Sequence, residues 1–325
     1  AERIQVAGEP LPDAALAAAL GEALALGPDL TFFEAATLAA FLAFRRAGVE
    51  LAVLEVGLGG RLDATNVVPA PAVGAITRIA LDHMDILGPT LPAIAREKAG
   101  IAKAGMPLVV GALDADVEEA IVAVAAAAGA RVERATEDAA AQTLVAAAPL
   151  GLAGAHQREN ALVAAAVGLR LGLASDAVAA GLAGARWPGR LETLLTAEGE
   201  YLLDAAHNPD GVAALLDHVG PGSERPEALV FGALADKAWA AMLDALAPRF
   251  PTRVYASPRG RAPADPAQLA ARHDGTPCPS VATALAEARR RVGQGGRVVV
   301  CGSIYLVGEA RAQLLGLPED PPVAL

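Results

Sequence analysis

Residues 51–66 read LAVLEVGLGGRLDATN and begin the most informative stretch of this chain. An apolar run, 51–54, ends on an acid, Glu55, and a glycine-rich turn follows it. Further along, a second apolar run, 73–80, is followed by a histidine, His83. Parallel strands present their carboxyl ends at one edge of a sheet, and ligands bind beyond that edge. The stretch therefore predicts an active-site edge built on two strands.

The rest of the chain continues this alternation. Short runs rich in Val, Ile and Leu separate Ala-rich stretches, and continuous apolar strands between helices indicate a parallel α/β sheet. The predicted strands are 51–56, 73–80, 106–110, 200–204, 228–232, 252–256 and 297–302. The predicted helices are 13–26, 34–47, 90–102, 115–128, 158–172, 209–218, 238–247, 280–294 and 304–314. The Trp-Pro-Gly sequence at 187–189 interrupts helical structure, and it predicts two domains, residues 1–186 and 187–325.

Composition narrows the class of protein. The 325 residues suit about two domains of ~150 residues, and a hydrophobic content of 54% is ample for their cores. The net charge is −11 and no basic stripe occurs, so nucleic acid and anionic membranes are not expected partners. The two cysteines, Cys278 and Cys301, have neither a disulfide framework nor zinc spacing. We therefore expect a reduced, cytoplasmic compartment and no membrane span.

Blocks of sequence in a fixed order resemble one family. They are EVGLGGRLDATN (55–66), LDHMDILG (81–88), HQREN (156–160), WPGRLE (187–192), LDAAHNP (203–209), ADK (235–237) and GSIYL (302–306). The chain resembles folylpolyglutamate synthase/dihydrofolate synthase, a branch of the Mur ligase superfamily. The resemblance implies an α/β fold: a Mur-ligase-like ATPase domain with a parallel sheet, followed by a smaller, doubly wound, Rossmann-like C-terminal domain that helps to place glutamate.

The resemblance also implies a metal site in the first domain. Glu55 and His83 match the residues that bind Mg²⁺, for which Mn²⁺ is a chemically suitable substitute. Lys98 matches a lysine that is carbamylated by CO₂ and supports the metal site, and we include it with Glu55 and His83 in the catalytic set. Taken alone, His83 would favour a helix cap or turn, and Lys98 would favour a solvated helix face.

Four further positions match nucleotide-binding residues of the family. They are Asn160, Arg190, Asp204 and His207. Arg190 suits this role because its planar fork can meet a phosphate with two hydrogen bonds. We expect the nucleotide to contact residues on both sides of the break at 187–189.

Two other motifs have structural interpretations. Gly57-x-Gly59 is not a dinucleotide fingerprint, because Leu62 stands where the third glycine would fall. Glu34 completes the pattern Thr31-x-x-Glu, which predicts a capping box at the start of a helix. Glu34 is therefore left out of the catalytic set.

The implied reaction is ATP-dependent amide ligation. A carboxylate of dihydropteroate, or of the glutamate tail of a folate such as tetrahydrofolate, is phosphorylated and then attacked by L-glutamate. We expect these small molecules and ATP to be the partners of the protein. We also expect the protein to be a monomer. Two alternatives are a non-catalytic Mur-ligase-like binding or scaffold protein and a fragment of an active enzyme. Both arise because no G-x-x-x-x-G-K-[ST] phosphate loop occurs in the 325 residues. We favour the fragment and expect these residues alone not to catalyse ligation.

Overall fold

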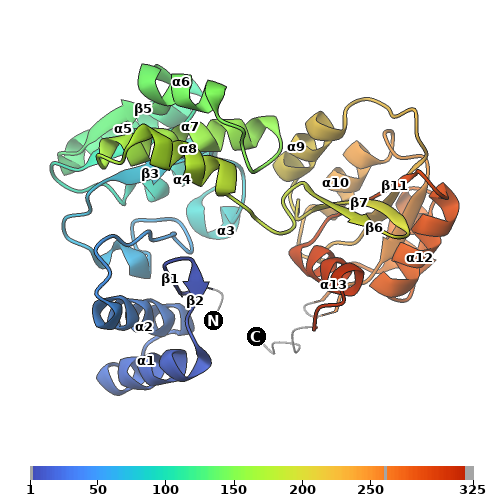
Figure 1. Cartoon of the computed structure of the whole chain (residues 1–325), viewed down its shortest axis with the longest axis horizontal. Coiled ribbons are helices and arrows are strands. Elements are labelled where there is room, and N and C mark those ends of the chain that lie inside the picture. Colours follow the sequence, from blue (N-terminus) through green and yellow to red (C-terminus); the bar gives the residue numbers. More distant parts are fainter. Residues whose placement is uncertain (1–2, 260–261, 319–325) are drawn as a thin grey trace. The chain divides into compact units, whose positions relative to one another are not determined.

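The computed structural model describes residues 3–259 and 262–318. The chain divides into two compact units, Ala1–Arg134 and Ala135–Leu325. Figure 1 labels helices and strands of both units. The boundary predicted from the sequence, between residues 186 and 187, lies inside the second unit. No helix in the described part of the chain is long and apolar enough to cross a membrane.

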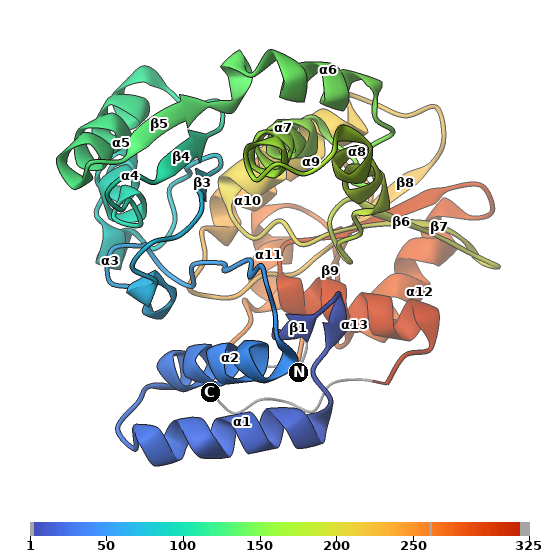
Figure 2. The same ribbon diagram turned by 60° about the vertical axis from the view of Figure 1, so that its left-hand side comes forward.

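The first unit begins with a helical hairpin. Strands β1 (Gln5–Val6) and β2 (Glu9–Pro10) pair antiparallel, and helices α1 (Asp13–Leu26) and α2 (Phe32–Ala47) follow. The two helices lie side by side in Figures 1 and 2 and enclose a small cluster made mainly of alanines. The predicted capping box is confirmed, because the Thr31 hydroxyl accepts from the Glu34 N–H and the Glu34 carboxylate accepts from the Thr31 N–H.

A three-stranded parallel sheet forms the core of this unit. Its order is β3 (Gly74–Ile76), β4 (Pro107–Val110) and β5 (Arg131–Arg134). Helices α4 (Leu91–Ala99) and α5 (Ala115–Ala128) pack on it through apolar side chains that include Ile94 and Ile121. The short helices η1 (Ala64–Val67) and α3 (Met84–Leu87) lie in the connections.

The predicted strand at 51–56 is wrong. This segment has no regular secondary structure and pairs with no described strand, and Val53 is 89% exposed. A strand gains its stability from a neighbouring ladder and from burial of its side chains, and an apolar run without either does not form one. The predicted strand at 73–80 is likewise shorter than expected, since only Gly74–Ile76 pairs, with β4.

The second unit starts with Ala-rich helices. The 3₁₀ turn η2 (Ala135–Glu137) leads into α6 (Ala139–Ala147), α7 (Ala155–Arg170) and α8 (Ser175–Gly184). Figure 2 shows α7 and α8 lying together. The sequence prediction included only α7 of these three helices.

A six-stranded sheet follows, in the order β10-β9-β8-β11-β7-β6. Its strands are β6 (Glu192–Thr196), β7 (Gly199–Asp204), β8 (Glu227–Phe231), β9 (Arg253–Ala256), β10 (Thr276–Cys278) and β11 (Arg297–Cys301). All pairs are parallel except β6 with β7, so the sheet is mixed. Because β6 and β7 form a hairpin, the chain enters the parallel sheet through an antiparallel edge strand.

Helices cover both faces of this sheet, as in a doubly wound fold. One core lies under α9 (Pro209–Val219), α10 (Trp239–Leu246) and α11 (Pro266–Arg272), and the other lies under α12 (Val281–Val292) and α13 (Ile304–Leu315). Both cysteines belong to these cores as free, buried thiols. Burial raises the pKa of the Cys301 thiol well above its usual range.

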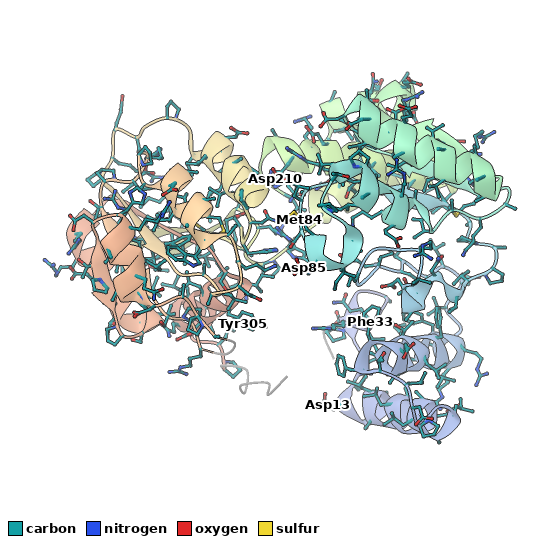
Figure 3. The ribbon with its side chains drawn as sticks, turned by 180° about the vertical axis from the view of Figure 1, so that it is seen from behind. Asp13, Phe33, Met84, Asp85, Asp210 and Tyr305 are labelled. Atoms are coloured by element: carbon teal, nitrogen blue, oxygen red, sulfur yellow. The ribbon has the colours of Figure 1, made fainter. Side chains whose placement is uncertain are left out.

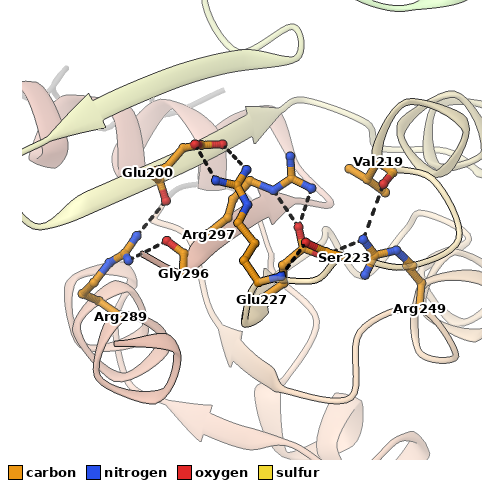
Figure 4. A network of polar contacts seen from close by, with 9 residues as sticks. Glu200, Val219, Ser223, Glu227, Arg249, Arg289, Gly296 and Arg297 are labelled. Carbon is orange, nitrogen blue, oxygen red and sulfur yellow. Dashed lines mark hydrogen bonds and ion pairs between the residues drawn. The ribbon is translucent and has the colours of Figure 1, made fainter. Parts of the chain in front are cut away.

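A network of arginines and glutamates lies at the amino ends of the strands (Figure 4). Glu227, at the start of β8, pairs with Arg249 and with Arg297. Its side chain is only 4% exposed, so the two guanidinium groups compensate a charge that water barely reaches. Glu200, at the start of β7, binds both terminal nitrogens of Arg225 at 2.8 and 2.6 Å.

Candidate active site

The glycine-rich turn of the first unit is held by one carboxylate. Asp63 Oδ2 accepts from the backbone N–H groups of Gly57 and Leu58, both at 3.0 Å. Its Oδ1 accepts from the N–H of Thr65 at 2.9 Å and from the Thr65 hydroxyl at 2.6 Å. Partial burial alone would raise the pKa of Asp63, but these hydrogen bonds outweigh burial and lower the pKa below its usual value. Asp63 therefore organises the turn through its carboxylate.

The turn is docked on the end of α4. The Arg61 N–H donates to the Glu97 carbonyl at 2.9 Å, and the Asn66 side chain donates to the Gly100 carbonyl at 3.0 Å. A Cβ on Gly60 would lie 2.9 Å from the carbonyl oxygens of Glu97 and Lys98, so only glycine allows this approach. The structure thus brings together two blocks that lie about 35 residues apart in the chain, the turn that follows Glu55 and the helix end that carries Lys98.

His83 stands at the start of a third element of this region. It has a left-handed backbone, with φ of 52°, at the N-cap of α3, and its carbonyl accepts from the N–H groups of Ile86 and Leu87. A Cβ on Gly59 would lie 3.0 Å from Leu87 Cδ2, so α3 also packs against the turn. Figure 3 labels Met84 and Asp85 on this helix. A left-handed non-glycine residue is uncommon and is found more often at functional sites than elsewhere.

The predicted catalytic side chains of this unit differ in exposure. Glu55 and His83 are exposed, whereas Lys98 is half-buried in the last turn of α4. No group of three or more His, Cys, Asp or Glu within residues 3–259 and 262–318 could hold a metal alone. Mg²⁺ binds one or two protein ligands and completes its shell with waters and substrate phosphates. One carboxylate and one imidazole fit that pattern, although the imidazole is the less usual donor.

In the second unit, Arg190 lies on a loop with an unusual backbone conformation on both sides of it. Its side chain is exposed, and its neighbours Gly189 and Leu191 both have left-handed backbones, with φ of 71° and 47°. The Arg190 N–H donates to the Trp187 carbonyl at 3.2 Å. The guanidinium is thus free to meet an anion while the chain beneath it is fixed. Leucine pays a steric cost for this conformation.

Asp204, at the end of β7, supports the same loop. It is 5% exposed, and its oxygens accept from the N–H groups of Leu191 at 2.9 Å and Ala206 at 3.0 Å. Burial raises the pKa of Asp204, against the lowering effect of these hydrogen bonds and of Arg190 and His156. Its present partners are backbone groups, so Asp204 acts first as an anchor of the Arg190 loop.

The remaining predicted nucleotide residues lie in the same unit. His207 Nδ1 is 3.0 Å from the Ala205 carbonyl, and the next residue, Asn208, caps α9 by accepting from the Gly211 N–H at 2.8 Å. Asn160, on α7, donates to Gln157 Oε1 at 3.2 Å. Figure 3 labels Asp210 and Tyr305 in the first turns of α9 and α13, which both begin at the carboxyl edge of the sheet.

His156 was not among the predicted site residues, although it belongs to the HQREN block. It lies in the first turn of α7, and a Cβ on Gly154 would lie 2.9 Å from His156 Cε1 and 2.7 Å from Leu191 Cδ1. Burial lowers the pKa of His156, Asp204 acts to raise it, and Arg190 acts to lower it. His156 is therefore a neighbour of the Arg190 loop, and the sequence signal for it was its place in the HQREN block.

Models of two domain families match most of the chain. Residues 13–168 match the Mur ligase middle domain, and residues 189–304 match the Mur ligase glutamate ligase domain. Folylpolyglutamate synthase of Lacticaseibacillus casei is 34% identical over 352 residues, which cover 97% of this chain and 81% of the relative. The chain belongs to the folylpolyglutamate synthase/dihydrofolate synthase family. The non-catalytic alternative finds no support among these relatives.

Members of this family differ in length. A probable bifunctional folylpolyglutamate synthase/dihydropteroate synthase of Haloferax volcanii is 37% identical over 95% of this chain, but the chain spans only 41% of that protein. The structure of the Escherichia coli family member in complex with DHPP and ADP superposes with a TM-score of 0.84, at 32% identity, and covers 97% of this chain and 79% of its own.

A further solved structure of the folylpolyglutamate synthase/dihydrofolate synthase family contains Mn, AMPPNP and L-glutamate. It has a TM-score of 0.83 and 33% identity, and it covers 97% of this chain and 79% of its own. Members of this family thus bind ATP analogues and a divalent metal.

The predicted site residues of this family member fall into two groups. Glu55, His83 and Lys98 lie in the first unit, and their blocks converge on the turn. The nucleotide set, Asn160, Arg190, Asp204 and His207, lies in the second unit, including the residues that we expected on opposite sides of the break. Sequence reasoning missed Asp63, whose only signal was an acid within a block that resembles the family.

Proposed function

We propose that this protein is an ATP-dependent amide ligase that adds L-glutamate to dihydropteroate, to the γ-carboxyl of folate glutamate tails, or to both. The observation that carries the proposal is the 34% identity to a folylpolyglutamate synthase over 97% of the chain. The solved relatives bound to DHPP with ADP, and to AMPPNP with L-glutamate, support the substrate classes. The domain division that goes with this function is residues 1–186 for the ATPase part and 187–325 for the glutamate ligase part.

The proposed reaction has two steps. The acceptor carboxylate attacks the γ-phosphorus of ATP, so that ADP leaves and an acyl phosphate forms. The glutamate amine then attacks the acyl carbon, phosphate leaves, and the amine loses a proton. Both steps depend on positioning and on charge neutralisation more than on covalent catalysis by the protein.

The residues of this chain supply those two needs. Arg190 offers an exposed guanidinium on a fixed loop, which suits a phosphate oxygen. Glu55 and His83 would hold Mg²⁺, which neutralises phosphate charge when it is bound. Lys98, at the carboxyl end of α4, would carry a carbamate, whose negative charge would support that site. Formation of the carbamate needs a neutral lysine amine.

A direct assay tests the proposal. Purified full-length gene product is given ATP, Mg²⁺ and L-glutamate, with dihydropteroate, with tetrahydrofolate, or with no acceptor, and ADP and the glutamylated product are measured. We expect ADP release that needs both glutamate and an acceptor. Nucleotide binding without any product would favour the scaffold alternative, and the preferred acceptor would distinguish the two synthase activities. Sedimentation of the same sample tests the expected monomer, and cell fractionation tests the expected cytoplasmic location.

A further inference from the structure

A second carboxylate holds the Arg190 loop from the other side. Glu192 Oε2 accepts from the Gly189 N–H at 2.8 Å. Both oxygens of Glu192 also lie 3.0 Å from Nε of Arg311. The side chains of Glu192 and Arg311 are 19% and 28% exposed, so this ion pair is largely removed from water. It is less screened than a surface pair.

The two left-handed residues beside Arg190 therefore donate their backbone N–H groups to different carboxylates. The Gly189 N–H donates to Glu192, and the Leu191 N–H donates to Asp204. The Gly189 carbonyl also accepts from the Ala205 N–H at 2.7 Å. The backbone on both sides of Arg190 is thus fixed by hydrogen bonds, two of them to carboxylates, and such charge-assisted bonds are stronger than neutral ones.

Arg311 connects this loop to the body of the unit. It lies on α13, whose residues Val307 and Ala310 are buried against the sheet. A Cβ on Gly189 would lie 2.8 Å from Val307 Cγ1, so the loop also touches the helix directly. Without the Glu192–Arg311 pair, the carboxylate that holds the Gly189 N–H would itself be less fixed, so the loop would be less constrained at Gly189 than at Leu191.

We propose that Glu192 and Arg311 are positioning residues that hold Arg190 in its nucleotide-binding orientation. The inference rests on the proposed function, in which Arg190 contacts the phosphates of ATP. A loop that is already ordered avoids the cost of ordering it when the ligand binds. Glu192 and Arg311 themselves do not touch substrate in this scheme.

The test compares two glutamates in the full-length protein. Glu192→Gln keeps the size of the side chain and removes its charge. Glu200→Gln is the matched control. Glu200 lies on the neighbouring strand β7, at the amino ends of the parallel strands, and pairs with Arg225; the two side chains are 22% and 37% exposed. We expect Glu192→Gln to raise the ADP Kd and the KM for ATP by roughly tenfold with a smaller change in kcat. Glu200→Gln should leave both constants unchanged.

Two further measurements separate positioning from general damage. In an Arg190→Ala background, Glu192→Gln should add nothing to the ADP Kd, because it acts through Arg190. Arg311→Ala should resemble Glu192→Gln, and Arg311→Lys should recover part of the affinity. Hydrogen exchange at the Gly189 amide should be faster in Glu192→Gln than in the wild type.

The outcomes distinguish the two proposals. If the wild type binds ADP and Glu192→Gln binds it equally well, the positioning role is overturned and the ligase proposal stands. Full additivity of Glu192→Gln with Arg190→Ala also overturns the positioning role. If the wild type neither binds ADP nor ligates, the proposed function fails and takes the nucleotide role of this loop with it.

Discussion

The buried carboxylate of Asp204 accepts a hydrogen bond at 2.9 Å from the backbone N–H of Leu191, a residue with a left-handed φ of 47°. Asp204→Asn keeps the shape but turns one acceptor into a donor that faces a backbone N–H. We expect a loss of about 1–3 kcal/mol in the free energy of unfolding. Urea unfolding of the two proteins at pH 7 measures this difference, and an unchanged midpoint would contradict the anchoring role.

The same pair predicts a pH dependence. Burial raises the folded-state pKa of Asp204 above its ordinary value of 3.8. The protonated form is therefore favoured by folding, so this contribution to stability is present below pH 3.8 and is lost as the pH rises through the folded pKa. The stability advantage of the wild type over Asp204→Asn should fall as the pH rises from 3.8. A difference that grows with pH would show that the hydrogen bonds outweigh burial.

Gly100 provides a test of how the glycine-rich turn docks on α4. A Cβ at this position would lie 2.3 Å from Arg61 Cβ, so Gly100→Ala should push the turn away and lower both stability and ligase turnover. Gly21→Ala is the control, because Gly21 lies within α1 with nothing within 4 Å of its Cβ position. Alanine there should be neutral or should stabilise the helix by up to about 1 kcal/mol. Thermal unfolding and ligase rates check both variants.

Glu55 and His83 are expected to act together on the metal. Both side chains are exposed, so Glu55→Ala and His83→Ala should retain the fold but lose turnover, most severely at limiting Mg²⁺. Glu50→Ala removes another exposed acid nearby and should keep normal turnover. Rates measured across a Mg²⁺ titration decide the matter, and near-normal turnover of both variants at limiting Mg²⁺ would remove the pair from the metal site.

Lys98 is expected to need its amine rather than its positive charge. Lys98→Ala should lose activity, and short carboxylic acids should restore part of it by standing in for the carbamate. Lys98→Arg keeps a cation that cannot be carbamylated, so it should remain inactive. Activity of the arginine variant equal to that of the wild type would exclude the carbamate.

Glu227 tests the network at the opposite edge of the sheet. The Glu227 side chain is 4% exposed and pairs with two arginines. Glu227→Ala would leave both arginine charges without this partner and should lower the free energy of unfolding by about 3–5 kcal/mol. Asp244→Ala breaks an exposed pair with Arg272, in which both side chains are more than 40% exposed, and should change stability little. Chemical unfolding of both variants compares the two environments.

Several helices could be predicted from short-range sequence signals alone. Helices α1 and α5 begin and end where predicted, and the capping box at Thr31 forms as expected. Helices α6 and α8 were missed, although they are about as rich in alanine as α1 and α5; they are shorter, at 9 and 10 residues against 14. The hairpin strand β6 was also missed, since its alternating exposure gives a weaker signal than a buried parallel strand.

The sequence motifs of the candidate site could be identified in advance, but the contacts between its residues could not. Glu55 was read as the end of a strand because an apolar run precedes it, yet strand formation depends on a neighbour that the run itself does not specify. Arg190 could be proposed as a nucleotide-binding residue from its motif. The acids that fix its loop could not, because their role depends on the left-handed backbone of Gly189 and Leu191, which the sequence pattern does not reveal for leucine.

The two buried cysteines have a practical consequence for measuring how this protein opens. Both lie in the second unit, and Cys301 is the register partner of Asp204 on the neighbouring strand. Cys301 is fully buried, so a thiol reagent can reach it only when that unit opens, and the first unit contains no cysteine at all. The rate of alkylation of Cys301 therefore reports the opening of the second unit alone. Slower labelling in the presence of ADP would measure how strongly the nucleotide keeps that unit closed, without any added probe.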